Sequence, residues 1–316
     1  MNMVNSRRGA LLSYRSVFAP DSFSDQTIVV TGGGSGIGRC TAHELAALGA
    51  HVVLIGRKQE KLTRVVEEIA EDRGQCSSYA IDIRNEESVA KTVRHIVRER
   101  GTIHGLVNNA GGQYPAMVKT ISKKGWEAVV SSNLTGGFLM SREVFNQSMC
   151  QTGGSIVNML ANMWGGMPGK AHSGAARAGM LNFTQTAAVE WAASGVRVNA
   201  VAPGGIASSG LDSYEAEARR DIVPKLRGSA PLKRLGEEAE VSAAIVFLLC
   251  EAASFITGSC LEIDGGASLN SALVSLPEHD RSRPYRGFHR AVRPKALDEI
   301  ETELKILVQP ELEQLE

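Results

Sequence analysis

A glycine-rich run, TGGGSGIG, covers residues 31–38 between the apolar stretch Ile28–Val30 and an amphipathic stretch that begins near Ile37. Glycines adopt backbone angles closed to other residues, and they let a ligand approach the main chain without meeting a Cβ atom. The free N–H groups and the dipole at the start of the following helix then attract a pyrophosphate. Such a run is often only a loop, but its position between a strand and a helix favours a dinucleotide-binding turn. The residues expected to contact the dinucleotide are Thr31, Gly32, Gly34, Ser35, Gly36, Ile37 and Gly38.

Two cations, Arg57 and Lys58, follow the next apolar stretch, His51–Ile55. At this point in a dinucleotide-binding fold, a carboxylate holds the two ribose hydroxyls of NAD. Arginine and lysine instead suit the 2′-phosphate of NADP, and a guanidinium matches the geometry of that oxyanion. The pair therefore favours NADP(H) as the cofactor, with a solvated basic turn as the alternative.

Two further segments follow predicted strands. Asp82 and Ile83 come after the third strand, where the edge of an adenine is expected. Asn109, Ala110 and Gly111 come after the fourth strand, where a ribose is expected. Both segments are predicted to contact the cofactor, although ordinary turn chemistry at a strand end would use the same residue types.

Strand-like and helix-like patterns alternate along the chain. The predicted strands lie at about 28–30, 51–55, 78–81, 105–107, 155–159 and 196–201. Helix-length segments separate them, including long ones at about 124–149 and 174–193. Strands connected in this way pair in parallel through right-handed crossovers, which predicts a doubly wound α/β sheet. Ligands of such sheets bind beyond the carboxyl ends of the strands. The residues that follow the sixth strand are therefore also expected at the cofactor, namely Pro203, Gly204 and Ile206.

The composition narrows the class of protein. With 316 residues, of which 43% are hydrophobic, the chain can form one large core. Its formal net charge of +0 provides no basic surface for nucleic acid, and no apolar run is long enough to cross a bilayer. The 5 cysteines are odd in number and scattered, which favours core thiols in a reducing compartment and no metal site.

The two ends of the sequence bear on localisation. Arg7, Arg8 and Arg15 precede the first acidic residue, Asp21, a bias that a transit peptide and an ordinary mobile terminus share. The final dipeptide, Leu315-Glu316, does not form a peroxisomal signal. Together these features lead us to expect a cytoplasmic protein.

Several motifs occur in a fixed order. They are the T-G-x-x-x-G-x-G spacing at 31–38, the NNAG turn at 108–111, Asn133 within a helix, and VNAVAPG at 198–204. In this order they resemble the short-chain dehydrogenase/reductase family from about Asp25 to Gly266, and 261–266 is similar to the closing strand of that family. The resemblance implies one Rossmann-type domain with about seven strands. It also implies a nicotinamide cofactor and a homo-oligomer, either a tetramer or a dimer.

The positions at which the sequence departs from the family pattern are more informative about the reaction than the positions that match it. Typical members carry a serine after the fifth strand and then a tyrosine and a lysine in Y-x-x-x-K spacing. In this sequence Ser173 stands at the tyrosine position and Arg177 at the lysine position, the serine position falls near 160–161, and only Asn133 is retained. A serine hydroxyl is too weak an acid to protonate an alkoxide, which disfavours ketone chemistry.

Reduction of a C=C bond conjugated to a thioester makes a different demand, because charge collects on the thioester oxygen and needs hydrogen-bond donors. Ser173, together with a water or amide held by Asn133, is predicted to donate to that oxygen. Arg177 is predicted to bind the nicotinamide ribose and to stabilise the enolate. The alternatives are that Ser173 only caps a helix and that Arg177 is only a surface cation.

The segment His172–Gly179 resembles the trans-2-enoyl-CoA reductase branch of the family. That resemblance implies an NADPH-dependent enzyme acting on a small-molecule acyl thioester. The nearest titratable residues to serve as proton donor are Tyr114 and His172, with water as the alternative. The rival functions are a divergent ketoreductase, a non-redox isomerase or dehydratase, and a catalytically silent NADP(H)-binding protein.

The chain is expected to comprise an N-terminal arm at 1–24, one domain at 25–269 and an extension at 270–316. A segment near 205–230 follows the sixth strand, where a lid would cover the nicotinamide. Within the extension, residues 296–308 show the pattern of an amphipathic helix. Such a helix is expected to dock on its own subunit or on a neighbour, with partner binding as the alternative.

Overall fold

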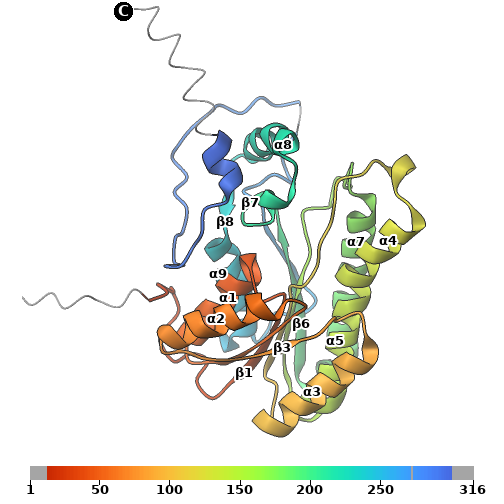
Figure 1. Ribbon diagram of the computed structural model, residues 1–316, viewed down its shortest axis with the longest axis vertical. Helices are drawn as coiled ribbons and strands as arrows, with labels where there is room; N and C mark the ends of the chain where they lie inside the picture. The colour runs from red at the N-terminus through yellow and green to blue at the C-terminus, as the bar shows by residue number, and fades with distance from the viewer. Residues whose placement is uncertain (1–12, 272, 301–316) are drawn as a thin grey trace, which may run out of the picture.

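A seven-stranded parallel sheet forms the centre of the protein (Figure 1). The computed structural model describes residues 13–271 and 273–300. The strand order is β3-β2-β1-β4-β5-β6-β9, and all neighbouring strands pair in parallel. The strands are β1 (Thr27–Thr31), β2 (His51–Gly56), β3 (Gln75–Ala80), β4 (Gly105–Asn108), β5 (Gly154–Met159), β6 (Val196–Pro203) and β9 (Cys260–Ile263). The predicted doubly wound α/β fold is confirmed.

Helices cover both faces of the sheet. One face carries α1 (Gly36–Ala47), α2 (Gln59–Glu71) and α9 (Glu238–Leu249), and the other carries α3 (Glu86–Arg100), α5 (Gly136–Val144) and α7 (Ala171–Glu190). Alternate residues of the central strands enter opposite cores, so that Val30 packs with α1 and α9 whereas Val29 packs with α3 and α5. This arrangement directs the carboxyl ends of all seven strands to one edge of the molecule.

The long helix predicted at about 124–149 is interrupted. It consists of α4 (Lys123–Val130), a π-helical segment (Ser131–Thr135), α5, a second π-helical segment (Phe145–Met149) and α6 (Cys150–Thr152). Wider π turns of this kind occur often at functional sites. The first of them contains the predicted site residue Asn133.

The predicted lid follows β6. It contains β7 (Ile206–Ala207), a 3₁₀ turn (Leu211–Ser213) and α8 (Ala216–Ser229), and β7 pairs with β8 (Gly236–Glu237) just before α9. In Figure 1, α8 lies above the sheet, on the opposite side of the strand ends from α4 and the start of α7.

The C-terminal extension packs on the same protein chain. Phe288 is buried in a cluster with Tyr14 and Cys40, and residues 295–300 are helical and place Leu297 and Ile300 in a cluster with Val223 of α8. The extension therefore contacts both the face formed by α1 and the lid. The rest of the predicted amphipathic helix, 301–308, and most of the arm, 1–12, lie outside the described residues.

Candidate active site

The turn between β1 and α1 has no room for side chains on its inner side. A Cβ atom on Gly38 would lie 2.5 Å from the carbonyl oxygen of Gly32, and Gly32 itself has a φ of +68°. Ser35, the N-cap of α1, makes no side-chain capping bond to the helix. The first turn of α1 thus presents main-chain N–H groups that no side chain of Ser35 satisfies, as an anion seat requires.

The ends of β1 and β4 are joined by hydrogen bonds. Thr31 Oγ1 accepts from the main-chain N–H groups of Asn109 (3.0 Å) and Ala110 (2.9 Å), and it donates to the carbonyl of Val107 (3.2 Å). Asn109 Nδ2 in turn donates to the carbonyl of Thr31 (3.0 Å). These bonds hold the 109–111 turn against the glycine-rich turn.

A cavity of about 440 Å³ opens beside these turns at the ends of β1, β2, β3 and β4. Its lining includes many of the predicted cofactor contacts, namely Gly32, Gly34, Ser35, Arg57, Lys58, Asp82, Ile83, Ala110 and Gly111. Their convergence on one concave surface is what a dinucleotide needs.

Two further cations line this cavity, and neither was predicted from the sequence. Lys61 lies one turn into α2, and Arg84 follows the end of β3. Arg84 forms a bidentate pair with Asp82 (Nη2–Oδ2 2.5 Å, Nε–Oδ1 2.9 Å), and this pair lowers the pKa of the Asp82 carboxyl. The pairing leaves less of the Asp82 charge to oppose an anion in the cavity. Lys58 and Lys61 are three positions apart, a spacing that puts two side chains on one face of a helix, so the sequence could have predicted Lys61 at this cavity.

Residues that follow β6 are placed differently from the turn residues. Pro203 ends β6, and a Cβ on Gly204 would meet Asp264 at 2.7 Å, so the chain passes closely between strands. Ile206 is 8% exposed and its side chain packs in the core under α9. A ligand can therefore meet Ile206 mainly through its main chain.

Ser173 and Arg177 lie one turn apart on α7. The helix begins at Ala171 with Lys170 as its N-cap, so the alternative that Ser173 caps the helix is wrong. Ser173 is fully buried, and its N–H donates to the carbonyl of Lys170 (2.9 Å). Residues at i and i+4 share one helix face, so both side chains project toward the same space.

Arg177 is not an ordinary surface cation. Its Nη1 donates to the carbonyl of Met159 at the end of β5, and burial lowers the pKa of its guanidinium to about 10. The group still carries its charge at neutral pH. A Cβ on Gly111 would lie 3.0 Å from Arg177 Nη2, which puts the guanidinium beside the turn that follows β4.

Three polar atoms at the start of α7 are buried and have no hydrogen-bond partner among the described residues. They are Ser173 Oγ, Arg177 Nε and His172 Nε2. Buried polar groups without partners are costly, and they usually mark a site where a ligand or water completes the bonding. All three atoms are buried, and none of the three residues lines the cofactor cavity.

Asn133 bonds mainly to the main chain, and its Nδ2 also donates to Ser132 Oγ (3.3 Å). Its Nδ2 donates to the carbonyls of Gly112 (2.7 Å) and Val129 (2.8 Å), and its Oδ1 accepts from the N–H of Gly112 (3.2 Å). Both amide hydrogens are thus engaged, and the carbonyl of Val129 is available because the helix widens into its π segment. Asn133 fixes the turn against which Arg177 lies, and it has no N–H left for the water or amide that the sequence analysis expected it to hold.

His172 and Tyr114 contact each other, with ring centroids 4.6 Å apart and the rings nearly perpendicular. Nδ1 of His172 accepts from the N–H of Ser173 (2.8 Å), which makes the imidazole a support for the start of α7. The Tyr114 hydroxyl lies next to Gly125, where a Cβ atom would overlap it. The phenol is therefore directed toward α4.

A different tyrosine comes from the lid. Lys170 Nζ lies 5.3 Å from the centroid of the Tyr214 ring, so Tyr214 contacts the N-cap residue of α7 just before Ser173. No spacing rule in the sequence connects these two residues, because the contact depends on how the lid folds back over the strand ends.

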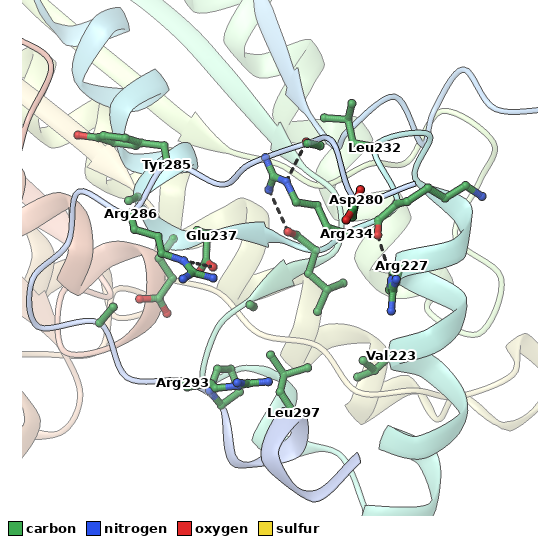
Figure 2. Close-up of a pocket in the computed structure, with 18 of the residues that line it drawn as sticks. Val223, Arg227, Leu232, Arg234, Glu237, Asp280, Tyr285, Arg286, Arg293 and Leu297 are labelled. Atoms are coloured by element: carbon green, nitrogen blue, oxygen red, sulfur yellow. Dashed lines mark hydrogen bonds and ion pairs between the residues drawn. The ribbon is translucent and has the colours of Figure 1, made fainter. Parts of the chain in front are cut away.

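A second and larger cavity, of about 1000 Å³, lies between α8, the start of α9 and the extension (Figure 2). Its charged residues largely pair with one another, as in Lys233–Glu278 (3.1 Å) and Arg286–Glu237 (3.5 Å). The Arg227 Nε donates to the carbonyl of Lys233 (3.0 Å). No predicted site residue lines this cavity, so it is distinct from the cofactor cavity.

Two observations on residues 13–271 and 273–300 concern membrane-spanning helices and metal sites. No helix in that part of the chain is both long enough and apolar enough to cross a membrane. In the same residues, no group of three or more histidine, cysteine, aspartate or glutamate side chains is arranged to hold a metal ion.

Comparisons with known proteins agree with this geometry. Residues 32–268 match the protein family described as enoyl-(acyl carrier protein) reductase. A protein of Bacillus subtilis named as a 2,4-dienoyl-CoA reductase is 36% identical over 248 residues, covering 78% of this chain and 97% of the relative. A 3-oxoacyl-[acyl-carrier-protein] reductase of Synechocystis is also 36% identical, over 76% of this chain and 96% of the relative.

Solved structures match over a similar span. The citronellol catabolism dehydrogenase AtuB of Pseudomonas aeruginosa is 62% identical, with a TM-score of 0.73, over 81% of this chain and 100% of that chain. A protein of Beutenbergia cavernae described as a gluconate 5-dehydrogenase, solved with bound NADP, is 32% identical with a TM-score of 0.74, over 80% of this chain and 100% of that chain.

Proposed function

The chain belongs to the short-chain dehydrogenase/reductase family, and from this premise we propose that it reduces the C=C bond of an α,β-unsaturated acyl thioester with NADPH. One observation carries the proposal. A serine hydroxyl and a guanidinium, each with a buried atom that has no partner among the described residues, share one face of α7, and the family resemblance assigns these positions to the tyrosine and lysine of alcohol chemistry. The name of the Bacillus subtilis relative, a 2,4-dienoyl-CoA reductase, supports the same chemistry.

Ser173, Arg177 and Asn133 each have a proposed role in this reaction. A bound NADPH would supply the hydride for Cβ of the substrate, and negative charge would then develop on the thioester oxygen. The Ser173 hydroxyl donates a hydrogen bond to that oxygen, and the Arg177 cation stabilises the charge from one helical turn away. Asn133 keeps the 109–112 turn in place beside Arg177.

The cofactor is proposed to be NADPH because of the charge around its cavity. Arg57, Lys58, Lys61 and Arg84 line the space at the end of β2 and β3, and the Asp82 carboxylate there is already paired. A 2′-phosphate suits these cations better than two neutral ribose hydroxyls do. The Beutenbergia cavernae relative, described as NAD(P) dependent and solved with NADP at low occupancy, supports a nicotinamide cofactor.

The enolate also needs a proton at Cα, and we propose that Tyr214 donates it. Its ring lies 5.3 Å from Lys170 Nζ, at the N-cap of α7, so the lid brings a phenol to the helix that carries Ser173. Tyr114 is less suited because its hydroxyl faces α4. His172 is proposed to position Ser173 through Nδ1.

A second candidate function follows from the names of two relatives. The relative that is 62% identical is named for citronellol catabolism, which favours oxidation of a branched unsaturated alcohol, and the Synechocystis relative favours ketone reduction. Both reactions need a group that exchanges a proton with an alcohol or alkoxide oxygen. Ser173 is a poor acid and base for that purpose, and for this reason we rank thioester reduction first.

The test compares substrates on the purified protein. NADPH consumption is measured with crotonyl-CoA and with acetoacetyl-CoA, and NADP⁺ reduction is measured with citronellol. Consumption with crotonyl-CoA supports the proposal. Activity only with acetoacetyl-CoA or only with citronellol would refute it, as would product formation without redox change. Tight NADPH binding without any turnover would favour a silent binding protein.

We also propose a cytoplasmic homo-oligomer, a tetramer or a dimer. Phe138 on α5 and Val189 on α7 are 37% and 79% exposed, and a subunit interface across these helices would cover them. The 5 cysteines carry free thiols, which suits a reducing compartment. The mass in solution tests the oligomer, and a monomer at working concentration would overturn it.

A further inference from the structure

Glu238 brings a carboxylate to the glycine-rich turn. It is the first residue of α9, and only 9% of its surface is exposed. The open side of Gly36 faces Glu238 Oε1 and Ser209 Oγ, since each lies 3.8 Å from the point where a Cβ atom of Gly36 would stand. The main-chain N–H of Ser209, at the start of the lid, also donates to this carboxyl. A buried acid thus lies beside the seat of an anion.

The charges around Glu238 do not neutralise it fully. Burial is the largest effect and raises the pKa of its carboxyl to about 7, the Arg39 cation of α1 lowers it, and the neighbouring Glu237 raises it. Arg286 of the extension pairs with Glu237 at 3.5 Å. The thiol of Cys40 on α1 stays protonated because burial raises its pKa. Near neutral pH the group that changes charge at this position is therefore Glu238.

We propose that Glu238 occupies the place of an anion while the dinucleotide seat is empty, and that NADP(H) binding is coupled to the uptake of one proton by its carboxylate. The carboxylate holds the Ser209 N–H and faces the positive end of α1 in the free protein. A pyrophosphate at the same helix end brings two like charges together, and the carboxylate is neutralised by a proton taken from solvent. This inference depends on the proposed use of NADP(H).

The large cavity gives the side chain room to respond. Glu238 and Ala207 of β7 both line it, so Glu238 stands between the glycine-rich turn and this space. Once its Ser209 partner is taken by the cofactor or shifts with the lid, the protonated side chain has an adjacent volume of about 1000 Å³ to enter. Figure 2 shows Glu237, the neighbour in sequence, directed toward Arg286 at the edge of the same cavity.

Calorimetry of NADP⁺ binding tests the coupling. At about pH 8 most of the free Glu238 is ionised, and the wild-type protein is expected to take up close to one proton per NADP⁺, seen as a dependence of binding heat on the ionisation enthalpy of the buffer. Between about pH 7 and 9 the wild-type Kd is expected to rise roughly tenfold per pH unit at the steepest point. This range lies above the second pKa of a phosphate monoester, about 6, so the 2′-phosphate does not contribute.

Two variants sharpen the test. Glu238→Gln is expected to bind without proton uptake, with a Kd that changes less than about twofold over the same pH range. Glu278→Gln is the matched control, because its carboxylate pairs with Lys233 (3.1 Å) in the same cavity, and it is expected to keep the wild-type proton uptake. The thermal midpoint of each variant checks the fold.

The outcomes are distinct. Binding of NADP⁺ to the wild-type protein without proton uptake would overturn the inference and leave the proposed function standing, and this measurement needs no variant. Equal proton uptake by the wild type and Glu238→Gln would overturn it as well. Failure of the wild-type protein to bind NADP⁺ at any pH would overturn both the inference and the proposed function.

Discussion

Ser173→Ala is predicted to make the protein more stable and the enzyme much slower. Ser173 is fully buried, and its Oγ lacks a hydrogen-bond partner among the described residues. A buried polar group in that condition costs roughly 1–3 kcal/mol of folding free energy. Alanine removes this cost and leaves a void only the size of a hydroxyl. We therefore expect the unfolding free energy of the cofactor-free protein to rise by about 1 kcal/mol.

The same hydroxyl is the proposed donor to the enolate oxygen. Loss of one such donor lowers kcat by roughly 100- to 1,000-fold. The Kd for NADPH is expected to stay the same, because the donor acts on the substrate. Urea denaturation of the cofactor-free protein measures the first effect, and the kcat for crotonyl-CoA reduction measures the second.

Ser242→Ala is the matched control. Ser242 is also fully buried, but its Oγ donates to Glu44 Oε2 at 2.5 Å, where α9 packs on α1. Removal of this bond to a buried carboxyl is expected to cost roughly 1.5–3 kcal/mol and to leave kcat unchanged. The two serine variants should therefore move stability and activity in opposite directions. If Ser173→Ala is destabilised like Ser242→Ala, or if it keeps the wild-type kcat, the assignment of Ser173 as an unpaired donor is wrong.

Three further changes test other parts of the site. Arg57→Ala is expected to raise the Kd for NADPH by roughly 10- to 100-fold, through loss of a charged hydrogen bond, and to leave the Kd for NADH nearly unchanged; an equal change for both cofactors would contradict the phosphate assignment. Tyr214→Phe is expected to lower kcat for crotonyl-CoA by roughly 100-fold, whereas Tyr285→Phe, which loses only a bond to the carbonyl of Arg15, should not. Phe288→Ala removes a buried ring that stacks on Tyr14 at 5.7 Å, and it is expected to cost roughly 3–5 kcal/mol in urea denaturation. Val292→Ala, at a position that is 64% exposed, is the control for the last change.

The sequence predicted the sheet well because its signals are local. Each strand is a short apolar run followed by a turn, and alternation with helices leaves parallel pairing as the expected result. The predicted and observed ends of a strand differ most where the strand residues are only partly buried. The predicted strand at 78–81 became Gln75–Ala80, whose residues are mostly half-buried, so no apolar run marked its start.

The interruptions of the long helix were not predictable from periodicity. The π segment at 131–135 contains ordinary helix-compatible residues, and it widens where Asn133 takes the carbonyl of Val129. Asn133 forms this bond together with its two bonds to Gly112, which lies in the loop after β4. Such a three-way arrangement exists only after the loop and the helix have met.

The same reason explains some of the site residues that were not predicted, but not all of them. Arg84 is adjacent to Ile83 in the sequence, and Lys61 lies three positions after Lys58, so helix spacing would have included Lys61. Tyr214 and Glu238 were different, because Tyr214 lies in the lid and Glu238 begins α9, and only the folded chain brings Tyr214 near α7 and Glu238 near the glycine-rich turn. Side chains that reach a site from such distant elements carry no signature at the level of local spacing.

The two ends of the described chain meet on the outer surface of α1. The N–H of Arg15 donates to the carbonyl of Gly287 (2.9 Å), and the Tyr285 hydroxyl donates to the carbonyl of Arg15. During synthesis Arg15 leaves the ribosome long before Tyr285 and Gly287 are made. The hydrogen bonds between these two segments therefore form only after the whole sheet has been synthesised. Contacts of such long sequence separation form late, because the chain must lose the most entropy to close them. A nascent chain that stalls before residue 285 would therefore hold a complete nucleotide fold whose α1 surface, with the ring of Tyr14, is still uncovered for chaperones or proteases to find.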